Sequence, residues 1–253
     1  MRLSGLGNRA NHVLDIVKRE GVGSLVRKIR GRTGFYDAAD EQWRKHKFAV
    51  DKVFDSEHGV ETGGIQDLFD MRVKGNDSRR LARNHVACDP EEFEAGLAAV
   101  NVDPREFTFI DLGSGKGRAL MLAAQHPFRR IIGVEFAEEL HRVAEENFRK
   151  LAAAKGPDDR IQLVHEDAGE YPLPDGPLLI FIYNSFHEEL MRKVAAKVLK
   201  SYRLSPRKIS IFYLNPMHND VWTAAGCQVA AKGPGFTILV PQSEAPRPDN
   251  AAS

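Results

Sequence analysis

The sequence has few cysteines and no long apolar run. Its 253 residues include two cysteines, Cys88 and Cys227, which lie far apart. They form neither a disulfide framework nor a zinc site, and their scarcity favours a reducing compartment. We therefore predict no metal site and a cytoplasmic location. No stretch approaches the roughly 20 apolar residues of a membrane-spanning helix. The first residues include Arg2 but lack the apolar core of a secretory signal.

Net charge is also small. The 36 Lys and Arg residues against 35 Asp and Glu give +1, which predicts no general attraction to nucleic acid. Residues 1–32 differ from the rest, because they hold eight basic residues and only two acids. Apolar residues at helical spacing within 8–30, interrupted by Gly21 and Gly23, predict two helices there. These helices either pack as an amphipathic pair or form a contact surface for RNA, an acidic partner or anionic lipid.

Strand-like and helix-like segments alternate from residue 107 onward, which predicts an α/β fold with a mostly parallel sheet. The continuous apolar run at 177–184 is typical of a central strand that is covered on both faces. The last two strands face each other across Gly233-Pro234-Gly235 and give an antiparallel C-terminal strand. We expect helices on both faces of seven strands. The strands are expected at 107–112, 130–135, 161–167, 177–184, 208–215, 228–232 and 236–240.

Residues 109–118 read Phe-Ile-Asp-Leu-Gly-Ser-Gly-Lys-Gly-Arg and form the motif around which the chain is organised. A strand, a glycine turn and a helix open a nucleotide-binding α/β unit. The glycines allow a sharp turn and a close approach of the backbone to a ligand. The helix that follows offers unpaired N–H groups and a positive dipole end.

The spacing of this motif decides between ligands. The dinucleotide fingerprint G-x-G-x-x-G needs a third glycine at the position of Arg118. A P-loop fails twice, because Ile110 replaces its first glycine and Gly117 its hydroxyl residue. Asp111 would repel a bound pyrophosphate, whereas it suits a cationic ligand.

Asp111-Leu-Gly113-Ser-Gly115-Lys-Gly117 resembles the first motif, D/E-x-G-x-G-x-G, of the class I S-adenosylmethionine-dependent methyltransferases. A narrower likeness, through F-x-D-L-G-S-G-K-G-R, is to bacterial methyltransferases of unassigned substrate. The non-SET histone lysine methyltransferases are similar at a greater distance. The resemblance covers about 107–240 and implies a Rossmann-like fold, methyltransferase activity and S-adenosylmethionine as cofactor. This cofactor carries an ammonium and a sulfonium and no phosphate.

Acids end three successive predicted strands, namely Asp111, Glu135 and Asp167. Ligands of open α/β sheets bind at the carboxyl ends of the strands. The resemblance implies that Asp111 faces the cationic amino end, Glu135 accepts the ribose hydroxyls and Asp167 accepts from the adenine amino group. It further implies that the Ala168 N–H donates to the ring. The cofactor-binding residues that we expect are Asp111, Gly113, Ser114, Gly115, Gly117, Glu135, Phe136, Asp167, Ala168 and Asn184.

The fourth predicted strand ends Tyr183-Asn184-Ser185-Phe186-His187, where the family places the target atom. Amino-methylating members carry [DNS]-P-P-[YFW], from which this chain departs at both prolines and at the aromatic residue. Nucleobase or glutamine methylation is therefore not implied. Asn184 and Tyr183 are the candidate catalytic residues. Asn184 would hold an amine, and Tyr183 with Phe186 would line a channel or stack on a cationic substrate. Alternatively, these aromatic residues belong to the core.

Upstream of the motif, the sequence predicts helices at 43–53 and 91–100 and a loop at 55–64. In the family such a loop folds over the cofactor as a lid, with His58 and Glu61 as candidate contacts; it is otherwise a surface loop. We expect a basic helical extension and lid-like segment at 1–64, the methyltransferase domain at 65–241 and a disordered tail at 242–253.

The resulting hypothesis is methyl transfer to an amine of a protein or another macromolecule. The distant lysine-methyltransferase likeness and the basic N-terminus favour this acceptor, while a small molecule stays open. One alternative is an NAD-dependent oxidoreductase, which Glu135 would serve equally well but the glycine spacing disfavours. Another is a non-catalytic cofactor-binding interaction module.

Overall fold

The computed structural model describes residues 38–66, 85–183 and 186–242. The chain divides into two compact units, residues 1–49 and 50–253. Helix α2 (Ala38–His58) crosses this boundary. The larger unit holds the sheet and the candidate site.

Several expectations fall outside the described residues. They are the helices within 8–30, the basic segment 1–32, Asn184 and the tail from residue 243 onward. These stay predictions. Among the residues that the structure does describe, no helix combines the length and the apolarity needed to cross a membrane.

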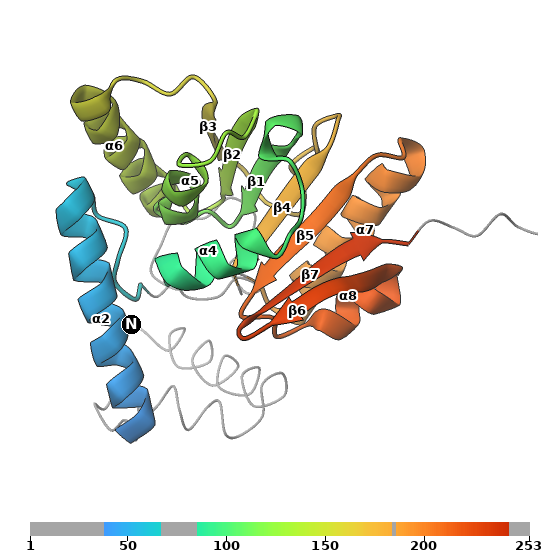
Figure 1. The fold of residues 1–253 in the computed structure, drawn as a ribbon, viewed down its shortest axis with the longest axis horizontal. Helices are drawn as coiled ribbons and strands as arrows, with labels where there is room; N and C mark the ends of the chain where they lie inside the picture. The colour runs from blue at the N-terminus through green and yellow to red at the C-terminus, as the bar shows by residue number, and fades with distance from the viewer. Residues whose placement is uncertain (1–37, 67–84, 184–185, 243–253) are drawn as a thin grey trace, which may run out of the picture. The chain divides into compact units, whose positions relative to one another are not determined.

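The sheet has seven strands in the order β3-β2-β1-β4-β5-β7-β6 (Figure 1). Neighbours pair in parallel from β3 to β5, and β7 is antiparallel to both β5 and β6. This confirms the predicted fold. The strands are β1 (Thr108–Leu112), β2 (Arg130–Glu135), β3 (Ile161–His165), β4 (Leu178–Tyr183), β5 (Ile209–Leu214), β6 (Cys227–Gly233) and β7 (Phe236–Pro241).

Strand order reverses between β1 and β4, which lie at the centre of the sheet. The apolar run Leu178–Tyr183 is buried along nearly its whole length, as expected for a strand covered on both faces. The carboxyl ends of β1, β2 and β4 therefore meet at one edge, next to the reversal point where ligands bind in open α/β sheets.

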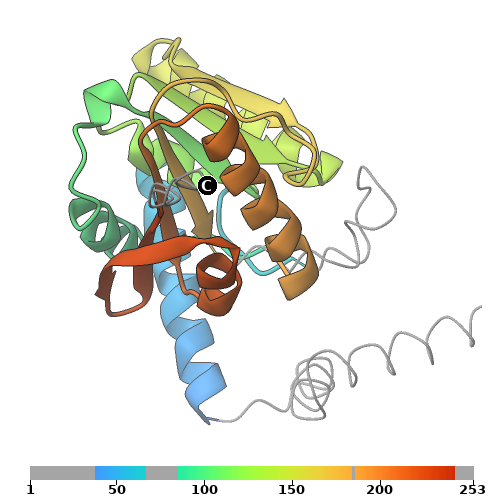
Figure 2. The ribbon, with the colours of Figure 1, turned by 90° about the vertical axis from the view of Figure 1, so that its right-hand side faces the viewer.

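Helices cover both faces of the sheet (Figure 2). Helices α7 and α8 pack over one face, while α4 and α5 pack over the other, together with Phe148 of α6. Besides α2, the described part of the larger unit holds the helices α4 (Pro90–Ala98), α5 (Arg118–Ala123), α6 (Glu138–Lys155), α7 (Glu188–Leu204) and α8 (Asn219–Ala225), with a 3-10 turn at Pro104–Glu106.

Helix α4 begins where the sequence predicts it. The Asp89 carboxylate accepts the Glu91 N–H at 2.9 Å and the Glu92 N–H at 3.4 Å, and Pro90 occupies the first turn. Helix α2 corrects a prediction, because the loop expected at 55–64 is helical as far as His58. No breaker interrupts residues 54–58, and the helix ends only where Gly59 adopts a φ of +67°.

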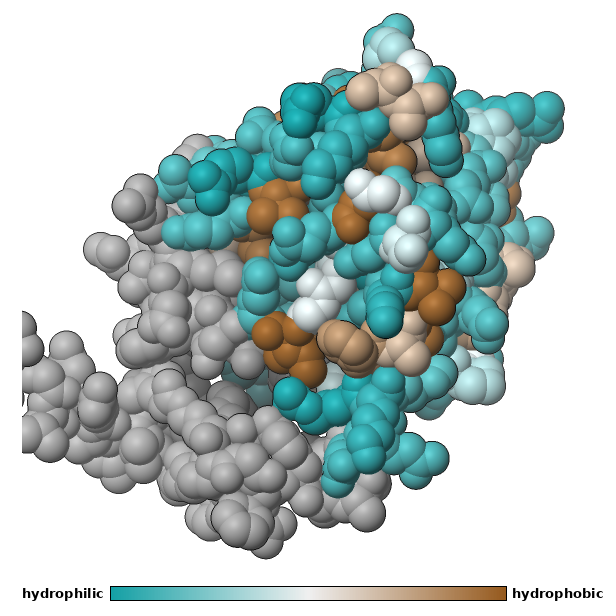
Figure 3. Space-filling view, turned by 90° about the vertical axis from the view of Figure 1, so that its left-hand side faces the viewer, coloured by the Kyte–Doolittle hydropathy of each residue, from teal (hydrophilic) through white to brown (hydrophobic). Residues whose placement is uncertain are grey.

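The surface in Figure 3 is mainly hydrophilic, with hydrophobic side chains in small separate groups. In the larger unit, the exposed large apolar residues are dispersed over different elements; they are Val53, Ile65, Leu204, Met217 and Val229. Apolar residues scattered in this way are normal on a globular protein.

Phe93 of α4 is fully buried against three aromatic rings of the central strands. Ring centroids lie 6.0 Å away at Phe109, 5.3 Å at Phe181 and 5.7 Å at Phe212. These contacts fix α4, and with it the connection that leads to the site.

We predict that Phe93→Ala lowers the free energy of unfolding by about 3–5 kcal/mol, because it removes buried area and leaves a cavity. Urea unfolding of the purified protein measures this loss. Phe93→Leu, which keeps most of the volume, should lose less than half as much. Equal losses in both variants would contradict a packing role for the ring.

Candidate active site

The glycine turn after β1 is held by backbone bonds to β2. The N–H groups of Gly113 and Ser114 both donate to the Val134 carbonyl, at 2.9 and 3.1 Å. Gly113, Gly115 and Gly117 have φ values of +87°, +53° and +91°, which side chains rarely adopt. A Cβ on Gly117 would lie 2.8 Å from the Phe148 ring, and one on Gly115 would collide with the His85 ring. Positions 115 and 117 therefore require glycine, because a side chain there would be strained in conformation and would also collide with a neighbouring ring.

Two carboxyl groups converge on this turn. Asp111, near the end of β1, and Glu135, the last residue of β2, are each 3% exposed. Glu135 accepts the N–H of Gly115 through Oε2 and that of Ala137 through Oε1, both at 2.8 Å. Glu135 thereby ties the end of β2 to the middle of the glycine turn.

Burial raises the pKa of both carboxyl groups. It raises the pKa of the Asp111 carboxyl well above its usual range, and the nearby Glu135 charge adds to this effect. Burial also raises the pKa of Glu135 to about 7, against the opposing effect of its backbone hydrogen bonds. A cationic ligand that binds near these two carboxyl groups would therefore stabilise their ionised forms.

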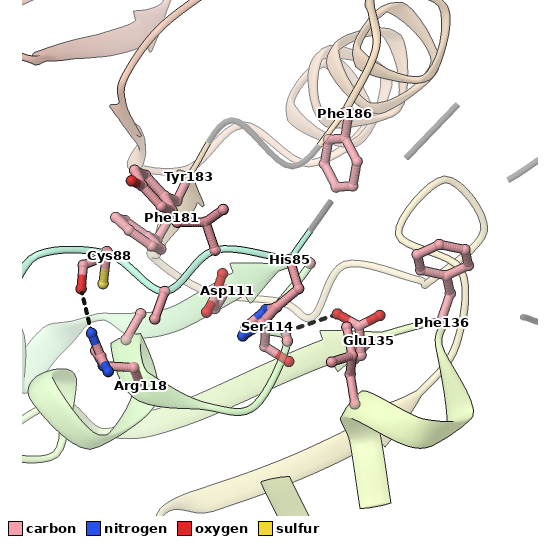
Figure 4. A pocket seen from close by; sticks show the side chains of 16 residues that line it. His85, Cys88, Asp111, Ser114, Arg118, Glu135, Phe136, Phe181, Tyr183 and Phe186 are labelled. Atoms are coloured by element: carbon pink, nitrogen blue, oxygen red, sulfur yellow. Dashed lines mark hydrogen bonds between the residues drawn. The ribbon is translucent and has the colours of Figure 1, made fainter. Parts of the chain in front are cut away.

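A pocket opens above the turn at the carboxyl edge of the sheet (Figure 4). Its floor holds Asp111, Glu135 and residues 113–115. Its walls are mostly apolar and aromatic, and they come from the segment before α4, from the β2–α6 junction and from the end of β4. These wall residues are His85, Val86, Ala87, Cys88, Phe136, Leu140, Phe181, Tyr183 and Phe186; Arg118 and Ala119 at the start of α5 complete the lining.

Most of the predicted site residues meet at this pocket, namely Asp111, Gly113, Ser114, Gly115, Glu135, Phe136 and Tyr183. Gly117 does not line it and instead caps the start of α5. Asp167 and Ala168 lie in the turn after β3, outside the pocket lining. Their assignment to adenine stays a prediction, as does that of Asn184.

The turn after β3 has its own supports. Asp167 accepts the Gly169 N–H at 2.7 Å through Oδ1. The Ala168 carbonyl accepts from the Lys197 ammonium, which also donates to the Tyr171 carbonyl at 2.7 Å. Desolvation lowers the pKa of Lys197 to about 8. Lys197 therefore braces the loop that the sequence assigns to adenine.

Both cations of the motif are paired with residues 51–63, and Arg118 also lines the pocket. Lys116, which is 2% exposed, donates to Glu61 at 2.9 Å and to the Gly63 carbonyl at 3.0 Å. Asn147 of α6 joins the same contact: its amide binds Glu61 N at 2.8 Å, Glu61 O at 2.9 Å and Lys116 O at 3.1 Å. The segment expected to be a lid or a surface loop is thus bonded to the glycine turn.

Arg118 is equally buried, and its partners also precede the motif. Its guanidinium donates to Asp51 at 2.5 Å, to Thr62 Oγ1 at 2.7 Å and to the Cys88 carbonyl at 3.2 Å. Asp55 lies 3.4 Å from Nη2. Of the two candidate lid contacts, Glu61 bonds to Lys116, whereas His58 stacks on Phe54 at the end of α2, outside the pocket lining.

Sequence reasoning missed His85, Arg118 and Asn147. Arg118 carried a signal, since it replaces a glycine in the dinucleotide spacing. His85 and Asn147 carried none, because their partners lie 23 to 86 residues away in the chain.

Comparison with known proteins identifies the domain. Residues 109–204 match the family model of a methyltransferase domain. No curated protein matches the chain. The family match and the seven-stranded sheet confirm the resemblance seen in the sequence. Residues 109–204 are therefore similar to a methyltransferase domain, and S-adenosylmethionine is the cofactor that this similarity implies.

Solved structures with a similar fold include methyltransferases of several kinds. A predicted N6-adenine-specific DNA methylase from Listeria monocytogenes is 15% identical over 62% of this chain and 52% of its own, with a TM-score of 0.48. An RNA methyltransferase from Salinibacter ruber, in complex with S-adenosyl-L-homocysteine, is 19% identical over 64% and 97%, with a TM-score of 0.45. The mitomycin 7-O-methyltransferase is 15% identical over 61% and 54%, with a TM-score of 0.43. The chain spans about half the length of the first and third of these proteins.

We predict that Asp111→Asn stabilises the ligand-free protein at pH 8, by about 1–2 kcal/mol, and has less effect at pH 5. The folded pKa values of Asp111 and Glu135 exceed their unfolded values. The stability that each protonated acid contributes is therefore fully present below about pH 4 and is lost as the pH rises through its folded pKa, which is about 7 for Glu135 and well above the usual range for Asp111.

Urea unfolding at both pH values measures this effect, with the exposed Asp159→Asn as the matched control. A variant at position 111 that is no more stable than the wild type at pH 8 would show that the buried charge is not costly.

Proposed function

We propose that this chain is a class I S-adenosylmethionine-dependent methyltransferase that transfers a methyl group to an amine of a protein or another macromolecule. The observation that carries the proposal is the convergence of two buried carboxyls, Asp111 and Glu135, on a glycine turn. When bound, S-adenosylmethionine supplies a methyl group on a positively charged sulfur. The remaining chemistry is a matter of binding, alignment and exclusion of water.

The residues of the pocket fit this cofactor. Asp111 lies in an apolar surrounding that raises its pKa, so a nearby ammonium or sulfonium would stabilise its ionised form. The two oxygens of Glu135 accept the N–H groups of Gly115 and Ala137, and a carboxylate has further lone pairs that a ribose hydroxyl can use.

The same contacts argue against a dinucleotide. A pyrophosphate needs cations or helix N–H groups that face it. Lys116 and Arg118 are instead directed to Glu61 and Asp51, and the acid that faces the turn is Asp111. The pocket therefore favours a positive ligand over NAD.

The aromatic wall supports an amine acceptor. An amine must arrive uncharged to attack a methyl group, and a dry apolar wall favours its neutral form. Phe181, Tyr183 and Phe186 supply such a wall at the end of β4. Burial raises the pKa of Tyr183, so its phenol keeps its proton at neutral pH. Tyr183 then orients the acceptor by hydrogen bonding and does not serve as a base.

The proposal extends to location and partner. We place the activity in the cytoplasm, which the two buried thiols of Cys88 and Cys227 support, since burial raises the pKa of Cys227 to about 12. The basic segment 1–32 favours an acidic protein or RNA as the macromolecule that carries the methyl acceptor.

Incubation with tritiated S-adenosylmethionine and a cell lysate depleted of small molecules tests the activity. We expect label in protein, with at least a tenfold loss in Asp111→Ala through the lost charge-assisted contact, and no loss in the exposed Asp159→Ala. Label in RNA would show that the methyl acceptor belongs to RNA and not to a protein. Cofactor binding without any label transfer would favour a non-catalytic binding module.

We predict that cofactor binding releases protons near neutral pH. Ribose hydroxyls bind the ionised form of Glu135, whose pKa in the ligand-free protein is about 7. Affinity for S-adenosylhomocysteine should therefore fall about tenfold between pH 8 and pH 6.

Calorimetry in buffers of different ionisation enthalpy measures the released protons directly. Glu135→Gln should bind more weakly at pH 8 and show a flatter pH profile. An affinity that is independent of pH and buffer in the wild type would remove Glu135 from the binding site.

A further inference from the structure

His85 lies over the glycine turn, at a position fixed by three bonds. Its backbone N–H donates to Gln66 O at 2.9 Å, and its carbonyl accepts from Gln66 N at 3.1 Å. Its ring Nε2 lies 3.2 Å from the Thr62 carbonyl. The ring packs so closely on Gly115 that a Cβ there would collide with Nδ1. His85 also lines the pocket.

The Thr62 carbonyl determines which ring nitrogen carries the proton. A carbonyl oxygen can only accept, so Nε2 donates and Nδ1 of the neutral ring is an acceptor. Burial lowers the pKa of His85 to about 4, and the nearby Lys116 and Arg118 charges act in the same direction. The ring is therefore neutral at physiological pH.

Thr62 is itself held rigidly, which makes the ring position definite. Its hydroxyl accepts from Arg118 Nε at 2.7 Å and donates to Asp55 Oδ1 at 2.5 Å. Its N–H donates to both oxygens of Asp55 at 3.0 Å. A continuous chain of hydrogen bonds thus runs from buried Arg118 through Thr62 to the pocket-facing ring of His85.

In the view of Figure 4, His85 lies between Asp111 and Glu135. All three side chains line the same pocket, while the cations Lys116 and Arg118 are neutralised by Glu61 and Asp51. We propose that His85 binds the methionine ammonium group of the cofactor through Nδ1, an assignment that rests on the proposed function. Asp111 supplies the charge for this group, and His85 supplies a directed neutral acceptor.

Two ligands separate this role from others. S-adenosylhomocysteine carries the ammonium group, whereas 5′-methylthioadenosine has the same adenosine but no amino acid part. We expect His85→Phe, which keeps a ring without nitrogens, to weaken binding of S-adenosylhomocysteine about 10- to 100-fold in calorimetry. Its affinity for 5′-methylthioadenosine should stay within about twofold of the wild type. His126→Phe, at a histidine paired with Glu94 outside the pocket, should change neither affinity.

Histidine NMR on the wild type provides a second readout that needs no variant. The Nδ1 signal of His85 should have the shift of an unprotonated nitrogen from pH 5.5 to 8 and should move with S-adenosylhomocysteine but not with 5′-methylthioadenosine. The assignment would be overturned if His85→Phe weakened the binding of both ligands equally. It would also be overturned if the Nδ1 chemical shift did not change when S-adenosylhomocysteine binds. A wild type that binds neither ligand would instead contradict the proposed function.

Discussion

The burial of the Arg118 guanidinium is the interaction on which the site depends. A buried cation is costly unless charge and hydrogen bonds compensate it, and here Asp51, Thr62 and the Cys88 carbonyl do so together. These partners come from α2, from the segment after it and from the segment before α4. One side chain of the glycine motif therefore gathers three stretches of chain around the turn, and removing it would leave Asp51 buried without its cation.

The direction of the charged groups then determines what the pocket can hold. Lys116 and Arg118 are neutralised by Glu61 and Asp51. Asp111 and Glu135 line the pocket, where burial keeps their pKa values high. Residues 109–118 therefore use their two cations in ion pairs within the protein and leave the Asp111 carboxyl at the pocket. This separation explains why a sulfonium compound fits where a pyrophosphate would be repelled.

Much of this arrangement could be read from the sequence, because it depends on short-range patterns. The strand at Arg130–Glu135 has the predicted bounds, since its apolar pattern sets them. The acids at strand ends were visible because parallel strands finish at one edge. The extent of α2, the partners of Arg118 and the placement of His85 were not visible. They depend on contacts between residues far apart in the chain, for which a single sequence holds no pattern.

The match to the methyltransferase domain starts at residue 109, yet the site starts earlier. Thr62 orients the His85 ring, residues 85–88 form a wall of the pocket, and Asn147 binds Glu61 and Lys116 at once. The domain supplies the glycine turn and the strand-end acids, which are general features of nucleoside binding in this fold. The segment before it supplies one wall, residues 85–88, and Thr62 positions the His85 ring in that wall. Differences in selectivity between this chain and other proteins with a similar domain should therefore reside in residues 85–88, because those residues decide which groups a bound ligand meets beyond the turn.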